Sequence, residues 1–305
     1  MAIASLFRVS ALSVIALCGL VAMDQAAPGV FVAEVVAQDK PKKDTRETRR
    51  TPALRNKVYE RLAEAQTLAE AKDYAGAAAI LNDMISEDGK RALNSYELAN
   101  VYNLHAFLSY ANDDYPQSLR YYEQVIAQPD IPLAMEINTR FTIAQLYFVQ
   151  ERWQQGIDAL LMWFEMNEKP NAGAYVLLAQ GYYQVKRYDL ALDNVETAIA
   201  MHEGEGKLPK EQWYNLARFL YFDKEDFDSA LDVLNTLIIY YPKKQYWVQA
   251  SHLYGEKKDE PRQLALMEAA YEQGFLDRSS ELVTMAYLYL NAEAPYYAGA
   301  VIEKG

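Results

Sequence analysis

The chain has a single cysteine, Cys18, which lies inside an apolar N-terminal run. A chain cleaved after that run would contain no thiol, which excludes disulfides, CxxC redox chemistry and a cysteine nucleophile. Glycine (13) and proline (11) are too few for a disordered or loop-rich chain. Sustained alternation of apolar and polar residues, the pattern of β-strands, is also missing. The abundant residues, among them Ala, Leu and Glu, favour helices instead.

Positive charge is scarce overall and concentrated in one segment. The formal net charge is −12, which argues against non-specific nucleic-acid binding because that requires a basic face. Between Lys40 and Arg61, however, nine Lys and Arg stand against three Asp and Glu. A basic arm thus precedes an acidic body. The arm is either a solubilising linker or an electrostatic contact with the chain's own body, an anionic membrane surface or an acidic partner.

The first residues have the pattern of a secretory signal. Arg8 precedes an apolar stretch from Val9 to Met23, which as a helix would span roughly 22 Å, short for a bilayer. Small residues before Gln38 form the best cleavage site, so we expect residues 1–37 to be a signal peptide. An uncleaved anchor and lipidation at Cys18 are the alternatives.

A repeat becomes visible in the segment AYVLLAQGYYQVKRYDLALDNV, which begins at Ala174. Its Tyr175-x2-Leu178-Ala179-x2-Tyr182, followed by Ala191, resembles the tetratricopeptide template W-x2-L-G-x2-Y with a later Ala. Large residues at these positions form a buried stripe, and small ones let the two helices of a hairpin approach closely. Tyr175, Tyr182 and Tyr188 therefore belong to the repeat pattern.

Degenerate copies of this pattern recur from about Val58 to the end of the chain. Their small-residue anchors are Ala77, Ser118, Gly156, Ala191, Ala230, a residue at about 265, and Ala298. Hairpins of this kind cannot bury their own faces and stack into a continuous core. The sequence therefore predicts an all-α solenoid of tetratricopeptide type, a right-handed superhelix of about seven helix pairs over residues 58–305. The array stops abruptly, so we expect a longer protein or a partner that covers its end.

In a tetratricopeptide array the first helix of each pair lines a groove. Positions one, five and eight residues after the first large residue face it. We name these positions the groove row and expect them to bind a peptide or partner protein by stacking and amide pairing. The alternative is that the same side chains pack between adjacent repeats. The row comprises Asn103, Phe107, Tyr110, Phe141, Gln145, Phe148, Gln180, Tyr183, Tyr214, Arg218, Tyr221 and Tyr287, together with Val176, Val283 and Leu290.

Motifs for chemistry are missing. There is no P-loop, GxGxxG or HExxH pattern. His105, His202 and His252 lie in different repeats, and His105 falls on a core-facing position where we expect a hydrogen-bonded interior residue. Acidic residues in the turns, such as Asp114 and Asp226, are expected to be solvated or to cap helices. The sequence thus predicts no enzyme, no catalytic residue, no cofactor and no metal site.

Two segments point to a narrower family. DTRETRRTPALRNKVYERLAEAQ, after the signal, and RQLALMEAAYEQGFLDRSSELVTMAYLYLNAEAPYYAGAVIEKG, at the end, resemble the periplasmic tetratricopeptide proteins of TonB–ExbB–ExbD systems in Gram-negative bacteria. The resemblance implies a periplasmic scaffold, accessory to TonB-dependent transport, with TonB, ExbB or ExbD as partners. The alternatives are a lipid- or helix-anchored module in outer-membrane or cell-wall biogenesis, and an enzyme or regulator of cell-wall turnover. We expect a signal at 1–37, a basic arm at 38–57 and the solenoid at 58–305.

Overall fold

The computed structural model describes residues 53–304, and all regular secondary structure in that range is helical. Fourteen α-helices and one short 3-10 helix follow one another there. This confirms the predicted all-α fold of helical hairpins. The predicted signal peptide and most of the basic arm lie outside the described residues.

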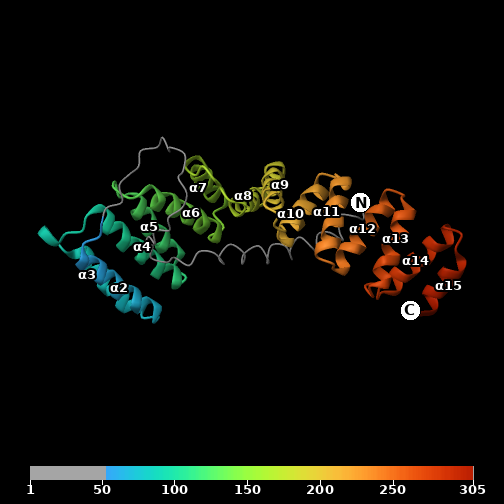
Figure 1. Ribbon diagram of the computed structural model, residues 1–305, viewed down its shortest axis with the longest axis horizontal. Helices are drawn as coiled ribbons and strands as arrows, with labels where there is room; N and C mark the ends of the chain where they lie inside the picture. Colours follow the sequence, from blue (N-terminus) through green and yellow to red (C-terminus); the bar gives the residue numbers. More distant parts are fainter. Residues whose placement is uncertain (1–52, 305) are drawn as a thin grey trace. The chain divides into compact units, whose positions relative to one another are not determined.

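The chain divides into two compact units, and the first ends at Lys186. Its helices pair along the chain, α2 with α3, α4 with α5 and α6 with α7, and α8 packs against α7 (Figure 1). Their bounds are α2 (Asn56–Glu70), α3 (Tyr74–Ser86), the 3-10 helix η1 (Gly89–Arg91), α4 (Ser95–Ala111), α5 (Tyr115–Ile126), α6 (Leu133–Val149), α7 (Trp153–Met166) and α8 (Ala172–Gln184).

The second unit begins at Arg187. Here α9 packs against α10, and the pairs are α10 with α11, α12 with α13 and α14 with α15. The bounds are α9 (Tyr188–Gly204), α10 (Glu211–Asp223), α11 (Phe227–Tyr240), α12 (Lys244–Glu256), α13 (Glu260–Glu272), α14 (Ser279–Asn291) and α15 (Pro295–Lys304). Six of the seven predicted pairs thus lie within one unit, while α8 and α9 fall on either side of the boundary.

The same tight turn recurs between the helices of each pair. In every case one charged residue adopts the left-handed backbone conformation, with φ between 55° and 63°. In six of these turns the next residue closes the turn by donating its backbone N–H to the carbonyl five positions back, as from Asp73 to the Leu68 carbonyl at 2.8 Å. Asp114 and Asp226 then cap the following helix, as the sequence predicts. The left-handed residues are Lys72, Asp113, Glu151, Lys186, Glu225, Lys258 and Glu293.

These turns fix the register of the small-residue anchors. Six of the predicted anchors lie five residues after a left-handed residue; Ser118, for example, is buried and its hydroxyl donates to the Ala106 carbonyl at 2.8 Å. The anchor predicted near residue 265 lies instead at Gln263, which is the residue five positions after the left-handed Lys258. A large side chain is tolerated there since the facing residue is Gly255, whose missing Cβ would lie 2.8 Å from the Gln263 Nε2.

Arg55, at the end of the predicted basic arm, binds the body of the first unit. Its guanidinium donates to both carboxylate oxygens of Glu97, with Nη2 at 2.7 Å from Oε2, and its backbone N–H donates to Oε1 at 3.1 Å. Glu97 is fully buried and also accepts from the backbone N–H of Asn94, which caps α4. Burial opposes ionisation, but the hydrogen bonds from Arg55 and Asn94 outweigh it and lower the pKa of Glu97.

Candidate functional site

The residues of the groove row differ in solvent exposure: some are buried, some half-buried and some exposed. Its residues lie on α4, α6, α8, α10 and α14, the first helices of their pairs. Asn103, Phe107, Tyr110, Phe141, Gln145, Gln180, Tyr183, Arg218 and Tyr221 are half-buried, Phe148, Val176 and Tyr214 are buried, and Val283, Tyr287 and Leu290 are exposed.

Phe148 is buried, contrary to the groove prediction. Its ring fills the space left by two glycines. A Cβ on Gly156 of α7 would lie 2.9 Å from the ring, and one on Gly181 of α8 would lie 2.6 Å from it. Phe148 therefore packs three helices of the first unit together and is not available to a partner.

Tyr214 is also buried rather than facing a groove. It belongs to the core cluster of α10–α12, and its hydroxyl donates to the Glu203 carboxylate at 2.8 Å. Burial and this hydrogen bond raise the pKa of Tyr214. The residue thus ties α10 to the end of α9.

The half-buried aromatic residues of the first unit pack against other residues of that unit. Phe141 lies against Trp163, with ring centroids 4.7 Å apart, and Tyr110 lies against Tyr115 at 5.5 Å. Phe107 packs against the core cluster of α2–α4. Phe141 and Tyr110 thus contact rings within their own hairpins, whereas the alternative stated from the sequence was packing between adjacent repeats.

A polar network fills the junction between α10 and α12. The Arg218 guanidinium donates to the side-chain oxygens of Gln249 and Asn215, and Tyr246 donates to Glu211. Burial lowers the pKa of Arg218, whose two amide partners carry no negative charge. Arg218, a member of the groove row, is thus bound by side chains of the chain itself. Tyr221, also in the row, donates its hydroxyl to Glu196 on α9.

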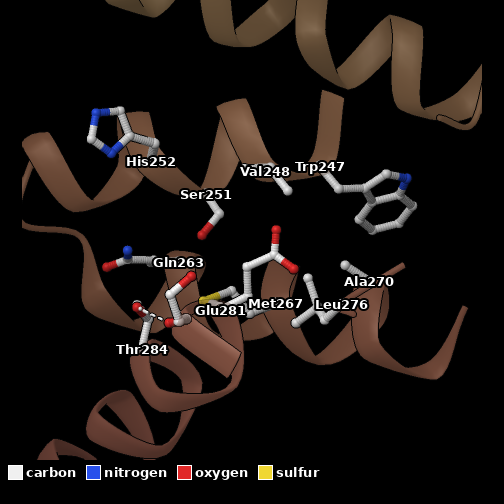
Figure 2. A pocket seen from close by; sticks show the side chains of 11 residues that line it. Trp247, Val248, Ser251, His252, Gln263, Met267, Ala270, Leu276, Glu281 and Thr284 are labelled. Carbon is white, nitrogen blue, oxygen red and sulfur yellow. Dashed lines mark hydrogen bonds between the residues drawn. The ribbon is translucent and has the colours of Figure 1, made fainter. Parts of the chain in front are cut away.

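The next junction, where α12, α13 and α14 meet, holds an open hollow of about 190 Å³. Figure 2 shows α12 along one side of it and residues of α13 and α14 opposite. The hollow combines an apolar and a polar set of side chains. The apolar set is Trp247, Val248, Met267, Ala270 and Leu276, and the polar set is Ser251, His252, Gln263, Ser280, Glu281 and Thr284.

The hollow exists because smaller or outward-turned side chains replace those that fill the preceding junction. Thirty-four residues after Arg218, His252 turns away, with its side chain 53% exposed and near Glu256. On the facing helix, Thr284 stands 35 residues after Gln249. The sequence analysis did not predict this site. The change from Arg218 and Gln249 to His252 and Thr284 at equivalent positions of the repeat indicates it.

Charge at the hollow is balanced within the chain. Lys244 binds the carboxylates of Glu281, at 2.9 Å, and Asp277. Desolvation opposes the charge on Lys244, but the hydrogen bonds that its ammonium donates to both carboxylates outweigh desolvation and raise the pKa of Lys244. Glu281 also accepts from the backbone N–H groups of Asp277 and Arg278 at the start of α14. A side chain that enters the hollow therefore meets no uncompensated charge from these groups.

Beside the hollow, α14 presents the most exposed part of the groove row. Tyr287 is 65% exposed, Leu290 52% and Val283 43%. Tyr287 lies three residues after Thr284 and seven after Ser280, which line the hollow, so the spacing puts it on the same side of the helix. The hollow and these residues form one surface, which we call the α14 surface.

Residues 53–304 contain no group of His, Cys, Asp and Glu suited to a metal ion. His105 is buried as expected, and burial lowers its pKa to about 4, but its Nε2 lacks a hydrogen-bond partner in the described part of the chain. None of the helices α2–α15 is both long and apolar enough to cross a membrane.

No family model matches the chain, and no curated protein matches it either. Several solved structures are similar to it at low sequence identity. The tetratricopeptide protein YrrB, described as having an unusual peptide-binding site, is 15% identical and covers 64% of this chain and 91% of its own, with a TM-score of 0.46. A tetratricopeptide protein from Parabacteroides merdae ATCC 43184 is 14% identical and covers 81% and 91%, with a TM-score of 0.48. Apo RapI is 11% identical and covers 82% and 100%, also with a TM-score of 0.48.

Proposed function

We propose that the chain is a non-enzymatic scaffold that binds a segment of a partner protein at the α14 surface. The hollow between α12 and α14 is the observation that supports this most directly. At about 190 Å³ it is smaller than the pockets of roughly 300–1,000 Å³ that hold drug-sized ligands. It suits one apolar or aromatic side chain, the kind of anchor that dominates protein interfaces.

The chemistry of the surface defines the segment that would bind. Met267, Ala270 and Leu276 favour an uncharged anchor, because a buried charge without a partner is costly. The exposed Tyr287 and Leu290 would cover apolar residues one or two turns further along a helical segment. Ser280 and Thr284 supply hydroxyls at the rim.

We further propose that this scaffold works in the Gram-negative periplasm, accessory to TonB-dependent energy transduction. The N-terminal pattern of a secretory signal and the two segments that resemble TonB-associated tetratricopeptide proteins support this proposal. The partner would then be TonB, ExbB or ExbD. Whether Cys18 is lipidated separates this proposal from that of an anchored module in envelope biogenesis.

The test is affinity capture from solubilised envelopes with the full chain and two variants. Ser280→Phe fills the hollow, whereas Ser279→Phe adds the same ring to an exposed neighbour that does not line it. We expect Ser280→Phe to capture at least about tenfold less TonB or ExbD than the unaltered chain, equivalent to about 1.4 kcal/mol of binding free energy. Ser279→Phe should capture as much as the unaltered chain. Equal capture by both variants would reject the hollow as the site. Recovery of outer-membrane assembly factors alone would reject the TonB proposal.

A further inference from the structure

An open pocket of about 280 Å³ lies in the first unit, between α3 and the α4–α5 hairpin. We call it the α4 pocket. Ala78 and Asn82 line it from α3, His105 and Ser109 from α4, and Tyr121 from α5. Its volume is at the lower end of the range for small-ligand sites, so it suits a single ring.

The α4 pocket lies where later helix pairs carry a tyrosine. Ser109 stands four residues before the left-handed residue of its turn. The same position in the five later pairs is occupied by Tyr147, Tyr182, Tyr221, Tyr254 and Tyr289. All five tyrosines are buried or half-buried. At this position α4 thus lacks a ring that the later repeats pack against their neighbours.

The preceding helix keeps a polar group where the tyrosine hydroxyl would end. Tyr147 donates its hydroxyl to Glu123 at 3.4 Å. Tyr221 likewise donates to Glu196. Both glutamates stand ten residues after the left-handed residue of the preceding turn, and the equivalent position on α3 is Asn82. The α4 pocket therefore retains an acceptor for a hydroxyl, but not the ring that carries the hydroxyl.

A second small side chain widens the α4 pocket on the side of α3. Ala78 stands six residues after the left-handed residue of its turn. In the next helix pair this position is Leu119, which is buried. Alanine in place of leucine and serine in place of tyrosine, on facing helices, together account for the open space.

His105 adds a hydrogen-bonding group that the fold does not use. Only 3% of the residue is exposed, and its Nε2 has no partner among the described residues. The equivalent positions of the five later pairs are all apolar: Ile143, Leu178, Ala217, Ala250 and Met285. Packing of the repeat therefore does not require a histidine here. A buried nitrogen without a partner is costly, and a ligand with a hydroxyl could supply that partner.

Charge at the α4 pocket disfavours an anionic ligand. Asp114 lines it, whereas none of the described residues in the lining is Lys or Arg. A phosphate or carboxylate on the ring would therefore meet a like charge without compensation. A neutral hydroxyl avoids this cost.

We infer that the α4 pocket binds a phenol ring, a neutral aromatic ring with one hydroxyl, in the place that the chain's own tyrosine occupies in later repeats. The ring belongs either to a tyrosine of a partner protein or to a small phenolic compound. This inference does not depend on the proposed function, because the α14 surface lies in the second unit and the α4 pocket in the first.

Isothermal titration calorimetry of the full chain with 4-methylphenol, which is the tyrosine side chain as a free compound, tests the inference. We expect saturable binding at one site. Toluene lacks the hydroxyl and should bind at least about tenfold more weakly, because polar groups of the pocket would stay unpaired. N-acetyltyrosinamide separates the two sources. If it binds as well as 4-methylphenol, the ligand is a tyrosine of a partner; if only 4-methylphenol binds, the ligand is a small phenol.

Two variants fill the α4 pocket with side chains that the repeat itself uses. Ser109→Tyr supplies the ring of the later repeats and should weaken 4-methylphenol binding at least about tenfold. Ala78→Leu supplies the equivalent of Leu119 and should have the same effect, so the test stands even if one variant does not fold. Ser279→Tyr, at an exposed serine of α14, is the matched control and should bind like the unaltered chain. Circular dichroism would verify the helicity of each variant.

Three outcomes would overturn the inference. A lack of saturable 4-methylphenol binding by the unaltered chain would show that the α4 pocket does not hold a phenol ring. Unchanged binding by a folded Ser109→Tyr or Ala78→Leu variant would place the ligand elsewhere. Toluene binding as tight as that of 4-methylphenol would show that the hydroxyl is not recognised.

Discussion

His105 shows how a single buried residue can set the pH dependence of stability. Its ring stacks on Tyr121, with centroids 4.7 Å apart and an angle of 11° between planes. Only 3% of the residue is exposed, and its Nε2 has no hydrogen-bond partner among the described residues. Burial without a partner favours the neutral imidazole, which lowers the pKa of His105 from 6.5 to about 4.

We expect the free energy of unfolding to fall as the pH drops from about 7 to 4. The unfolded chain takes up a proton on His105 near pH 6.5, whereas the folded chain resists it down to about pH 4. The contribution of neutral His105 to the free energy of unfolding is therefore fully present above about pH 6.5 and is lost as the pH falls towards about 4. Its maximum is about 3 kcal/mol. Urea unfolding of His105→Leu should lack this component. A pH profile of the free energy of unfolding in His105→Leu that matches the wild type would contradict this account.

At the scale of helices, the close approach of α6, α7 and α8 depends on glycine. We expect Gly181→Ala to lower the free energy of unfolding by about 1–2 kcal/mol, because overpacking against the Phe148 ring outweighs the gain in helix propensity. Gly299→Ala on α15 is the control, since a Cβ there meets nothing within 4 Å. It should leave stability unchanged or raise it by up to about 1 kcal/mol. Denaturant midpoints would compare the two, and equal effects would contradict this account.

The helices were predictable from the sequence, but the exposure of their side chains was not. Local spacing identifies the hairpins, because the anchors and capping acids lie a few residues from each turn. Burial of Phe148 depends instead on Gly156 and Gly181 on two other helices. The displaced anchor at Gln263 likewise depends on Gly255 across the hairpin. Contacts between helices, which no local pattern encodes, decide which members of the groove row reach the surface.

At the scale of the whole chain, the main contacts join helices that follow one another, with α2 and α4 as the exception. Among the described helices, α15 contacts mainly α14 and α2 contacts mainly α3, whereas α11 and α5 each pack against two neighbours, so less packing opposes local opening in α15 and α2. We expect hydrogen exchange to be faster in α15 than in α11, and faster in α2 than in α5. Mass spectrometry of peptic fragments would measure this. Uniform protection across either unit would show that it opens as a single cooperative body.

The recurring turn has a consequence for how such a chain can change. Each turn ends one helix, and in four of the seven an aspartate caps the next helix within a few residues, so a hairpin carries its own boundaries. The left-handed residue is charged in all seven turns, at a strain of about 1 kcal/mol each that glycine would relieve. Segments cut at these residues could be duplicated, exchanged or grafted as cassettes. Stability and partner choice are then separately adjustable, the first at the turns and the second on the helix faces between them.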